Sequence, residues 1–421
     1  MVMSMNKRPV LRFAGYQDEW KQRKLLDHVQ KIVDFRGRTP KKLGMEWSDG
    51  GYLALSALNV KDGYIDFSQD VHYGDQALYD KWMSGNDLHQ GQVLFTTEAP
   101  MGNVAQVPDD KKYILSQRTI AFEVNKDLVT ENFFAVALRS PGVFQTLNAL
   151  SSGGTAKGVS QKSLASVDIT IPQDLNEQHN LAELFLLIDK LIALHQRKYD
   201  KLLTYKKAML EKMVPKDGTD VPEVRFAGFA NPWTKCKLSQ LLFLSEDRND
   251  GTYTRNDVLA ASLGTELAKK HIYFGLRATD ESVKSYKVVK PRDVIYTKSP
   301  IKGFPNGIIR TSKGAEGIVP TLYCVYHSID TVNPSIIQSY FESRERLDKY
   351  LMPLVNIGAR NNVNITDTEF LEGLICIPHD VQEQTMIVEF LERLSRLITF
   401  HQLKLDKLTS IKKALLDKMF V

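Results

Sequence analysis

The chain contains 421 residues, of which 43% are hydrophobic and 25% are charged, so it is long enough for two or three globular domains with ordinary cores. Its formal net charge of +5 permits a nucleic-acid partner without requiring one. Three scattered cysteines without a Cys-x-x-Cys pair argue against a disulfide framework or a cysteine-based zinc site. No apolar run is long enough for a membrane span or typical of a signal peptide, so we expect a cytoplasmic protein.

The chain opens with a motif that recurs later. Residues 9–16, PVLRFAGY, lead to Trp20, and residues 222–229, PEVRFAGF, lead to Trp233 at an offset of 213 residues. Self-similarity of this kind indicates a tandem duplication. We expect each half to consist of the opening motif, a variable domain and a long helix.

The first variable domain is rich in short β-forming runs. Residues 51–55, 92–96 and 119–122 read as strands separated by turns, which is typical of a mainly β domain with few helices. Residues 131–150 read as one helix, and residues 167–171 read as a closing strand that feeds the long helix.

Two loops of this domain carry polar and basic side chains. Residues 35–42, FRGRTPKK, are strongly basic, and residues 151–162, SSGGTAKGVSQK, precede the closing strand. Such side chains read base edges in the major groove, and glycine, serine and backbone N–H groups suit phosphates, although any single residue could equally lie in a solvated loop. The candidate DNA-binding residues of this half are Arg36, Arg38, Lys41, Lys42, Thr155, Lys157, Gln161 and Lys162.

Residues 174–213 predict a helix of about 40 residues, roughly 60 Å long. Asp174 and Glu177 form an Asp-x-x-Glu capping pattern directly after a segment ended by Pro172. Apolar residues then recur at steps of three and four, and only His195 interrupts the stripe. A stripe of this length needs a partner helix. The candidate packing positions are Leu184, Ile188, Leu191, His195 and Leu202.

The second half repeats this order after a short linker with proline and glycine. Residues 293–297, 334–351 and 374–377 read as the matching strand, helix and closing strand. The offset between the halves falls from 213 to 206, so this variable domain is about seven residues shorter. Its loops differ from those of the first half, and one scaffold with different loops is what we expect of two different recognition specificities. The candidate DNA-binding residues here are Arg248, Asn249, Lys298, Lys302, Arg360, Asn361 and Asn362.

Residues 380–419 repeat residues 174–213 without a gap, and roughly half of the aligned positions are identical. His401 interrupts the apolar stripe at the position of His195. We favour a buried, hydrogen-bonded histidine pair that fixes the helix register over a metal site, because no further ligand accompanies the pair; a docking role stays open. The candidate packing positions of this copy are Phe390, Leu394, Leu397, His401 and Leu408.

Lysines gather in the last turns of both long helices. They complement the helix dipole, and they could equally form a docking surface for a partner. The lysines are Lys206, Lys207 and Lys212 in the first copy, and Lys412, Lys413 and Lys418 in the second.

The sequence offers no catalytic motif. It contains no P-loop and no Asn/Asp-Pro-Pro-aromatic motif of adenine methyltransferases. Residues 231–233, Asn-Pro-Trp, belong to the repeated opening motif, and residues 108–112, PDDKK, fit a surface turn better than a nuclease core, because no paired acidic strand accompanies them. We therefore expect a non-catalytic chain without a metal site.

Together these motifs resemble one family over essentially the whole chain. The motifs are the duplicated Pro-x-x-Arg-Phe…Trp opening, the Val-Leu/Ile-Phe/Tyr-Thr strand, and the Ile-Pro…Glu-Gln helix that ends in Lys-Lys-Ala-Met/Leu-Leu-Glu/Asp-Lys-Met. In this order and duplication, they resemble the DNA specificity subunits (HsdS) of type I restriction–modification systems.

The resemblance implies an α+β fold in which two mainly β α/β target recognition domains, residues 1–171 and 222–377, are joined by two long helices. The helices, residues 172–214 and 378–421 with a linker at 215–221, then pack as an antiparallel coiled coil with an internal pseudo-twofold repeat. Each recognition domain reads one half of a bipartite, gapped target in double-stranded DNA, and the helices set the spacing.

The implied partners are two modification subunits and restriction subunits. The modification subunits are adenine-N6 methyltransferases that use S-adenosylmethionine, and the restriction subunits are ATP-dependent translocases and nucleases. The resemblance places S-adenosylmethionine, ATP and Mg on these partners and no cofactor in this chain. Two alternatives remain, namely a free-standing DNA-binding regulator and a coiled-coil scaffold without a DNA role.

Overall fold

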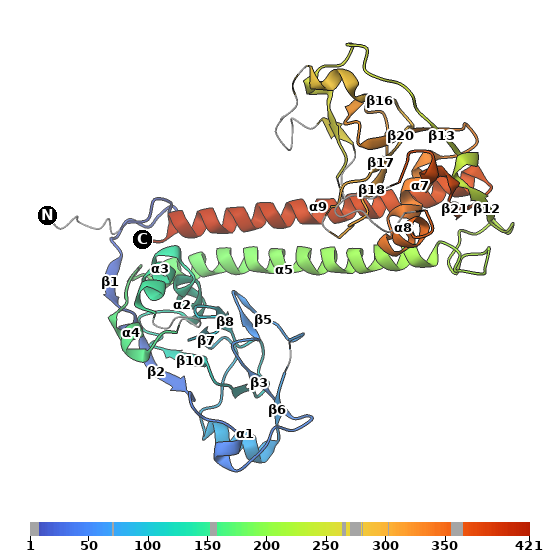
Figure 1. Cartoon of the computed structure of the whole chain (residues 1–421). Coiled ribbons are helices and arrows are strands. Elements are labelled where there is room, and N and C mark those ends of the chain that lie inside the picture. The colour runs from blue at the N-terminus through green and yellow to red at the C-terminus, as the bar shows by residue number, and fades with distance from the viewer. Residues whose placement is uncertain are drawn as a thin grey trace. The chain divides into compact units, whose positions relative to one another are not determined.

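The computed structural model describes residues 8–69, 71–151, 158–262, 267–269, 279, 281–301, 303–354 and 365–421. The chain divides into two compact units (Figure 1). Unit 1 consists of Met1–Leu194 together with Lys404–Val421, and unit 2 consists of His195–Leu403. Each unit therefore combines one variable domain with segments of both long helices.

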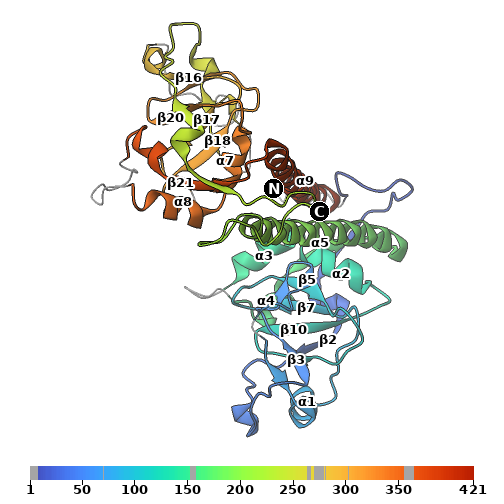
Figure 2. The ribbon, with the colours of Figure 1, turned by 90° about the vertical axis from the view of Figure 1, so that its right-hand side faces the viewer.

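A four-stranded antiparallel sheet forms the centre of unit 1. Its strand order is β2 (Val29–Asp34), β10 (Thr119–Val124), β7 (Val93–Thr96) and β8 (Val104–Gln106). Because side chains alternate along a strand, Phe95 and Phe122 join one core while Leu94 and Ala121 join a second core on the other face. Helices α2 (Glu131–Leu138) and α3 (Pro141–Leu150) lie between this sheet and the long helix α5 (Figure 2).

The other elements of unit 1 surround this sheet. They are β1 (Lys21–Lys24) paired with β11 (Asp168–Ile171), β3 (Tyr52–Leu55) paired with β6 (Tyr73–Gly74) and β9 (Ile114–Leu115), the hairpin β4 (Val60–Lys61) and β5 (Tyr64–Ile65), the helices α1 (Gln76–Met83) and α4 (Gln161–Ser166), and the short helices η1 (Leu25–His28) and η2 (Lys41–Leu43).

Unit 2 repeats this arrangement. Its central sheet has the order β13 (Leu242–Leu244), β20 (Tyr323–Ser328), β17 (Val294–Thr297) and β18 (Ile308–Thr311), which matches the sheet of unit 1 strand by strand. The remaining elements are β12 (Thr234–Lys237) with β21 (Leu374–Ile377), β14 (Leu259–Ala260) with β15 (Ala268–Lys269), β16 (Lys287–Val289) with β19 (Gly317–Val319), the helices α7 (Pro334–Phe341) and α8 (Arg344–Leu351), and η3 (Leu238–Gln240), η4 (Arg255–Asp257), η5 (Ser282–Ser285) and η6 (Glu369–Glu372).

We expected one helix after each central sheet, and this prediction is wrong in both units. Two short helices stand there instead, α2 and α3 in unit 1 and α7 and α8 in unit 2. In unit 1, Ser140 is extended and Pro141 occupies the first turn of α3, where its missing N–H costs nothing. In unit 2, the Ser343 hydroxyl accepts a hydrogen bond from the Arg346 N–H and begins α8 anew. Hydrophobic periodicity alone does not show such a restart.

The two long helices are α5 (Leu175–Lys212) and α9 (Val381–Met419), of 38 and 39 residues. In unit 1 the rings of Phe185 and Phe420 lie 5.8 Å apart. In unit 2 Tyr205 of α5 packs against Phe390 of α9 at 6.3 Å. A second pair in each unit fixes the direction: Asp189 of α5 lies 2.9 Å from Lys412 of α9 in unit 1, and His195 lies 2.8 Å from His401 in unit 2. Within each unit the partner's number on α9 falls as the number on α5 rises, so the helices pack antiparallel, as expected.

The candidate packing positions differ in burial. Ile188, Leu394 and His401 are buried. Leu191 and Leu397 are exposed among the described residues. The half-buried positions are Leu184, His195, Leu202, Phe390 and Leu408.

The opening motif of unit 1 is clamped to the start of α5. Arg12 donates to both carboxylate oxygens of Glu177, at 2.6 and 2.8 Å, and Trp20 Nε1 donates to the same carboxylate at 3.3 Å. Glu177 is only 1% exposed, so this is a buried charge that the guanidinium neutralises.

Unit 2 contains the same clamp. Arg225 donates to Glu383 at 2.7 and 2.8 Å, and Trp233 Nε1 donates to it at 3.3 Å. The glutamates were expected to complete capping boxes, and that expectation is wrong, because both carboxylates turn inward to a guanidinium and an indole. The aspartate of each pattern does cap its helix: the Asp174 carboxylate accepts the Asn176 N–H at 2.7 Å.

The glutamine after each clamp glutamate completes the junction. Gln178 accepts the Thr130 N–H at 3.0 Å and donates to the Pro172 carbonyl at 2.9 Å. In unit 2, Gln384 accepts the Asn333 N–H at 2.8 Å. The Glu-Gln pair therefore joins the opening motif, the closing strand and the residue that precedes the short helix after the sheet.

We predict that Glu177→Gln destabilises unit 1 by about 3 kcal/mol, because it leaves the Arg12 guanidinium without its anion in a largely buried position. Hydrogen exchange of residues 9–20 measures the effect, and residues 222–233 of the intact second clamp serve as the internal reference. The matched control is Glu183→Gln, which changes an exposed glutamate on the same helix. Equal exchange in both variants would contradict the prediction.

The predicted histidine pair is present in unit 2. The Nδ1 atoms of His195 and His401 lie 2.8 Å apart. One imidazole must donate while the other accepts, so the bond requires at least one neutral ring. Burial, together with repulsion from the neighbouring His195 and Lys198, lowers the pKa of His401 below its ordinary value.

This lowered pKa predicts a pH dependence of the helix pair. The unfolded histidine binds a proton more readily than the folded one, so the stabilisation is complete above about pH 6.5 and is lost as the pH falls toward the lowered pKa of the folded state. We expect the thermal midpoint of unit 2 to fall more steeply between pH 7.5 and 5.5 in the native chain than in the His195→Leu/His401→Leu variant. Parallel curves would rule out a contribution from the pair.

Candidate nucleic-acid interface

Asp34, at the end of β2, gathers two of the candidate side chains. Arg36 donates to Asp34 through Nε at 2.8 Å and Nη2 at 2.6 Å, and Gln161 at the start of α4 donates to the same oxygen at 2.8 Å. Burial alone raises the pKa of Asp34, but the hydrogen bonds from Arg36 and Gln161 bring it below its usual value. Two loops far apart in sequence thus meet at one ionised carboxylate.

The basic loop after β2 is fixed by its own contacts. The Arg38 guanidinium lies 4.4 Å from the centre of the Phe35 ring and donates to the Trp82 carbonyl. Lys42 Nζ donates to the Gly37 carbonyl at 2.7 Å. Lys41 and Lys162 are exposed. Thr155 and Lys157 lie outside the described residues.

A hollow of about 290 Å³ lies beside these loops. Arg118 lines it, with a left-handed φ of 66° that is uncommon for a residue other than glycine. Its Nε lies 3.0 Å from the Glu98 carboxylate. Strained backbone of this kind is concentrated at functional sites. The residues that line the hollow are Arg36, Gly37, Thr97, Glu98, Gln117, Arg118, Gly158, Val159 and Ser160.

Gln117 and Arg118 are site candidates that the sequence reasoning missed. Gln117, just before strand β10, donates a hydrogen bond to the Arg38 carbonyl. This bond connects the wall of the hollow next to β10 to the basic loop, residues 35–42. The sequence signal for them is weak: they are two polar residues directly before an expected strand. Arginines held by carboxylates keep their planar forks ordered, which suits bidentate recognition of bases and phosphates.

In unit 2 two candidates have structural contacts instead of free polar groups. Asn249 is 6% exposed, and its amide donates to the Tyr253 and Val283 carbonyls at 2.9 and 3.1 Å. Lys298 donates to the Ile365 carbonyl at 2.6 Å and to Asp367 at 2.9 Å. Both side chains therefore shape the loops that carry them.

The other candidates of unit 2 are less constrained. Arg248 is exposed and makes one long contact of 3.5 Å to the Ser285 carbonyl. Lys302, Arg360, Asn361 and Asn362 lie outside the described residues.

Asp367 accepts hydrogen bonds from Lys287, Lys298 and Cys324 and so connects three segments of unit 2. Burial alone raises its pKa, but hydrogen bonds from Lys287, Lys298 and Cys324 lower it to about 2. Burial raises the pKa of the Cys324 thiol to about 12, so it stays protonated and unreactive at neutral pH.

Among the described residues, no group of three or more His, Cys, Asp and Glu side chains could hold a metal ion. No helix within the described ranges is long and apolar enough to cross a membrane.

The arrangement of sheets, loops and long helices is that of a known class. Residues 17–204 match the family of the type I restriction modification DNA specificity domain. The fold is similar to the crystal structure of the type-I restriction-modification system S subunit from M. genitalium, with a TM-score of 0.64 and 13% identity over 98% of this chain and 99% of that one.

Two further solved structures are similar at lower scores. The HsdS subunit from Thermoanaerobacter tengcongensis has a TM-score of 0.40 and 16% identity over 95% of this chain and 96% of that one. A chain in a structure that describes complex assembly and conformational transition of the type I R-M system has a TM-score of 0.46 and 16% identity, over 95% of this chain and 97% of that one.

These findings define a DNA specificity domain in residues 17–204, the part of the chain that the family model covers. The second half repeats the same elements in the same order. Residues 17–204 therefore contain a type I restriction modification DNA specificity domain, and the fold of the whole chain is similar to that of an S subunit of such a system.

Proposed function

We propose that this subunit reads a bipartite, gapped DNA target, one half with residues 1–171 and the other with residues 222–377. The observation that supports this most is the repeated central sheet, which carries different loops in the two units. A shared scaffold with unlike loops suits two unlike half-sites. The helices, residues 172–214 and 378–421 with the linker 215–221, set the gap between them.

In this proposal double-stranded DNA meets unit 1 at the hollow beside β10. Arg36, Arg118 and Gln161 contact bases or phosphates there, and the exposed Lys41 and Lys162 attract the backbone. In unit 2, Arg248 takes the corresponding part together with Lys302, Arg360, Asn361 and Asn362, which lie outside the described residues. Asn249 holds the segment that follows Arg248 through the Tyr253 and Val283 carbonyls, and Lys298 holds Ile365 and Asp367.

The proposed partners are two modification subunits, adenine-N6 methyltransferases that bind S-adenosylmethionine, and restriction subunits that use ATP and Mg. The modification subunits dock on the long helices. This chain then supplies recognition in the cytoplasm and no chemistry of its own. A free-standing DNA-binding regulator would have the same fold but no methyltransferase partner.

Co-expression with the modification subunit, followed by mapping of methylated adenines across the host genome, tests the proposal. We expect a gapped methylated motif that disappears when this chain is omitted. DNA binding without a stable complex and without methylation would support the free-standing regulator instead.

We predict that Arg118→Ala weakens or relaxes recognition of one half-site by about 10-fold and leaves the other half-site unchanged, because a bidentate arginine–base contact contributes about 1–3 kcal/mol of discrimination. Binding to DNA libraries randomised in each half-site at fixed salt measures this. Lys126→Ala, an exposed lysine of the same unit away from the hollow, is the control. Equal losses at both half-sites would argue against separate reading.

A further inference from the structure

The central sheets of the two units can be compared position by position, because their strand registers agree. In unit 1 Thr119, the first residue of β10, pairs with Thr96, the last residue of β7. In unit 2 Tyr323, the first residue of β20, pairs with Thr297, the last residue of β17. The residues beyond this edge of the sheet therefore have direct counterparts in the other unit.

A two-residue turn precedes the strand at this edge in both units. It consists of Gln117 and Arg118 before β10, and of Thr321 and Leu322 before β20. The second residue of each turn is exposed. Equivalent backbone positions thus present a planar cation in unit 1 and an apolar side chain in unit 2.

An arginine, by contrast, is common to both units at the neighbouring edge strand. In the registers of the paired strands, Ile32 of β2 corresponds to Leu244 of β13. Arg36 and Arg248 each stand four residues further along the chain, and both are exposed. Contacts to phosphates position a protein on the duplex, and contacts to base edges specify the sequence. An arginine that both units share suits the first role, and a residue that differs between them suits the second.

The backbone and one ion pair hold Arg118 in place. Its φ is 66°, and its carbonyl accepts the Thr97 N–H at 2.8 Å. Its Nε lies 3.0 Å from the Glu98 carboxylate. Within the part of the chain that the structure describes, no acceptor lies within hydrogen-bond distance of its Nη1 or Nη2. The fork that arginine uses on guanine O6 and N7 is therefore available.

Arg118 and Glu98 together match the major-groove edge of one kind of base pair. A G·C pair presents two acceptors, guanine N7 and O6, and one donor, the cytosine N4 amino group. The guanidinium supplies two donors and the carboxylate supplies one acceptor. Both side chains are accessible, at 56% and 42% exposure. An A·T pair, with an acceptor, a donor, an acceptor and a methyl group, does not match this pattern.

Leu322 offers a different chemistry at the same position of unit 2. It is 43% exposed, and the counterpart of Glu98 in the register is Ser299, so no carboxylate stands beside it. Lys298, which lies next to it in the register, donates to Asp367 at 2.9 Å. The apolar feature of the major groove is the thymine methyl group. A single exposed leucine is common on any surface, but this one occupies the position of Arg118.

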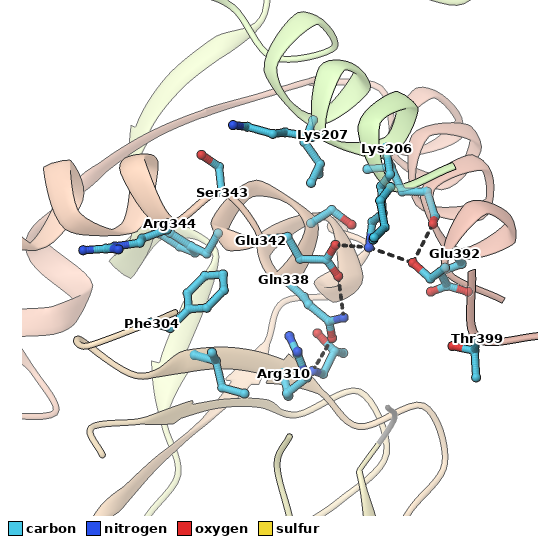
Figure 3. Close-up of a pocket in the computed structure, with 18 of the residues that line it drawn as sticks. Lys206, Lys207, Phe304, Arg310, Gln338, Glu342, Ser343, Arg344, Glu392 and Thr399 are labelled. Atoms are coloured by element: carbon cyan, nitrogen blue, oxygen red, sulfur yellow. Dashed lines mark hydrogen bonds and ion pairs between the residues drawn. The ribbon is translucent and has the colours of Figure 1, made fainter. Parts of the chain in front are cut away.

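Unit 2 also contains a cavity of about 1040 Å³, but its charges are paired within the chain. Lys206 lies 2.6 Å from Glu342 and donates to Ser395 at 2.8 Å (Figure 3). Lys313 lies 2.6 Å from Glu392. Cations and carboxylates alternate in this wall, so it has no field of one sign to attract a DNA backbone. The cavity therefore does not compete with the turn as a DNA-reading site.

We propose that the turn before β10 and β20 specifies one base pair in each half-site. Arg118 together with Glu98 reads a G·C pair in the half-site of unit 1. Leu322 contacts the methyl group of a thymine in the half-site of unit 2. Arg36 and Arg248 contact phosphates and fix the register of each unit on the duplex. This assignment rests on the proposed reading of a bipartite target and names the base pairs that two positions recognise.

The test of Arg118 uses the complex of the full chain with the modification subunit, and the target that methylation mapping gives. Each guanine is replaced in turn by 7-deazaguanine, which lacks the N7 acceptor. We expect binding by the native chain to weaken about 5-fold at one guanine of one half-site, since one charge-assisted hydrogen bond is lost. Arg118→Ala should bind both DNAs equally.

Arg118→Asn provides a gain of a new preference. Asparagine tolerates the left-handed φ of this position and forms bidentate hydrogen bonds with adenine N6 and N7. We therefore expect the preference at that base pair to change from guanine to adenine, while the other half-site stays unchanged. Binding to a library randomised at that base pair measures the change.

The test of Leu322 replaces each thymine in turn by uracil, which lacks the methyl group. Binding by the native chain should weaken about 4-fold at one thymine of the other half-site, which corresponds to the loss of one buried methyl group. Leu322→Ala should bind both DNAs equally. The matched control is Leu374→Ala, an exposed leucine of β21, which should respond to uracil as the native chain does.

The outcomes separate this assignment from the proposed function. If no gapped target is found, the proposed function fails. If a target is found but no guanine or thymine responds in this way, only the base assignment fails. Arg118 contacts a phosphate instead, and the assignment is overturned, if Arg118→Ala weakens all sequences equally and reduces the salt slope by about 1.

That uniform loss is the result expected for Arg36→Ala and Arg248→Ala, because a phosphate contact carries no sequence information. A changed base preference in either variant would overturn their phosphate role. Hydrogen exchange of residues 9–20 and 222–233 verifies that the variants keep both clamps.

Discussion

Each unit depends on one buried glutamate. Glu177 and Glu383 are 1% exposed, and each accepts hydrogen bonds from an arginine and a tryptophan of the opening motif. The motif, the closing strand and the first turn of a long helix therefore meet at a single carboxylate. Because a buried charge without its partner is strongly destabilising, the junction between helix and recognition domain is defined in one geometry. Loops at the far side of the sheet can then change without disturbing it.

The two long helices and six of the strands could be predicted because their signals are local and periodic. Three- and four-residue spacing gave both long helices, and the gapless repeat paired His195 with His401 before any contact was known. The clamps could not be found in this way. Glu177 stands at a normal capping position in the sequence, and only the fold brings Arg12, 165 residues away, to its carboxylate. Ion pairs between residues far apart in the chain produce no periodic pattern in the sequence, so sequence periodicity does not reveal them.

The candidate site was less predictable for a related reason. A side chain that reads DNA and one that holds a loop have the same chemistry. Asn249 and Lys298 are polar loop residues by sequence. In the structure Asn249 donates its hydrogen bonds to neighbouring backbone and Lys298 donates to Asp367, so both side chains hold the protein's own loops. Conversely, Arg118 stands before an ordinary strand, and its strained φ and its place beside Arg36 emerge only in three dimensions. Residue type gives the possible chemistry, and burial decides which part of it is available.

Unit 1 is discontinuous, since Lys404–Val421 complete it. The Phe420 ring lies 6.1 Å from Trp20, 5.8 Å from Phe133 and 5.8 Å from Phe185, so the aromatic core of the first recognition domain closes only around a residue from the far end of the chain. Unit 2 is one uninterrupted segment. On the ribosome the first unit therefore cannot fold ahead of the second, because its aromatic pocket stays unfilled until Phe420 has been synthesised. Chaperone dependence during synthesis should accordingly centre on the N-terminal half.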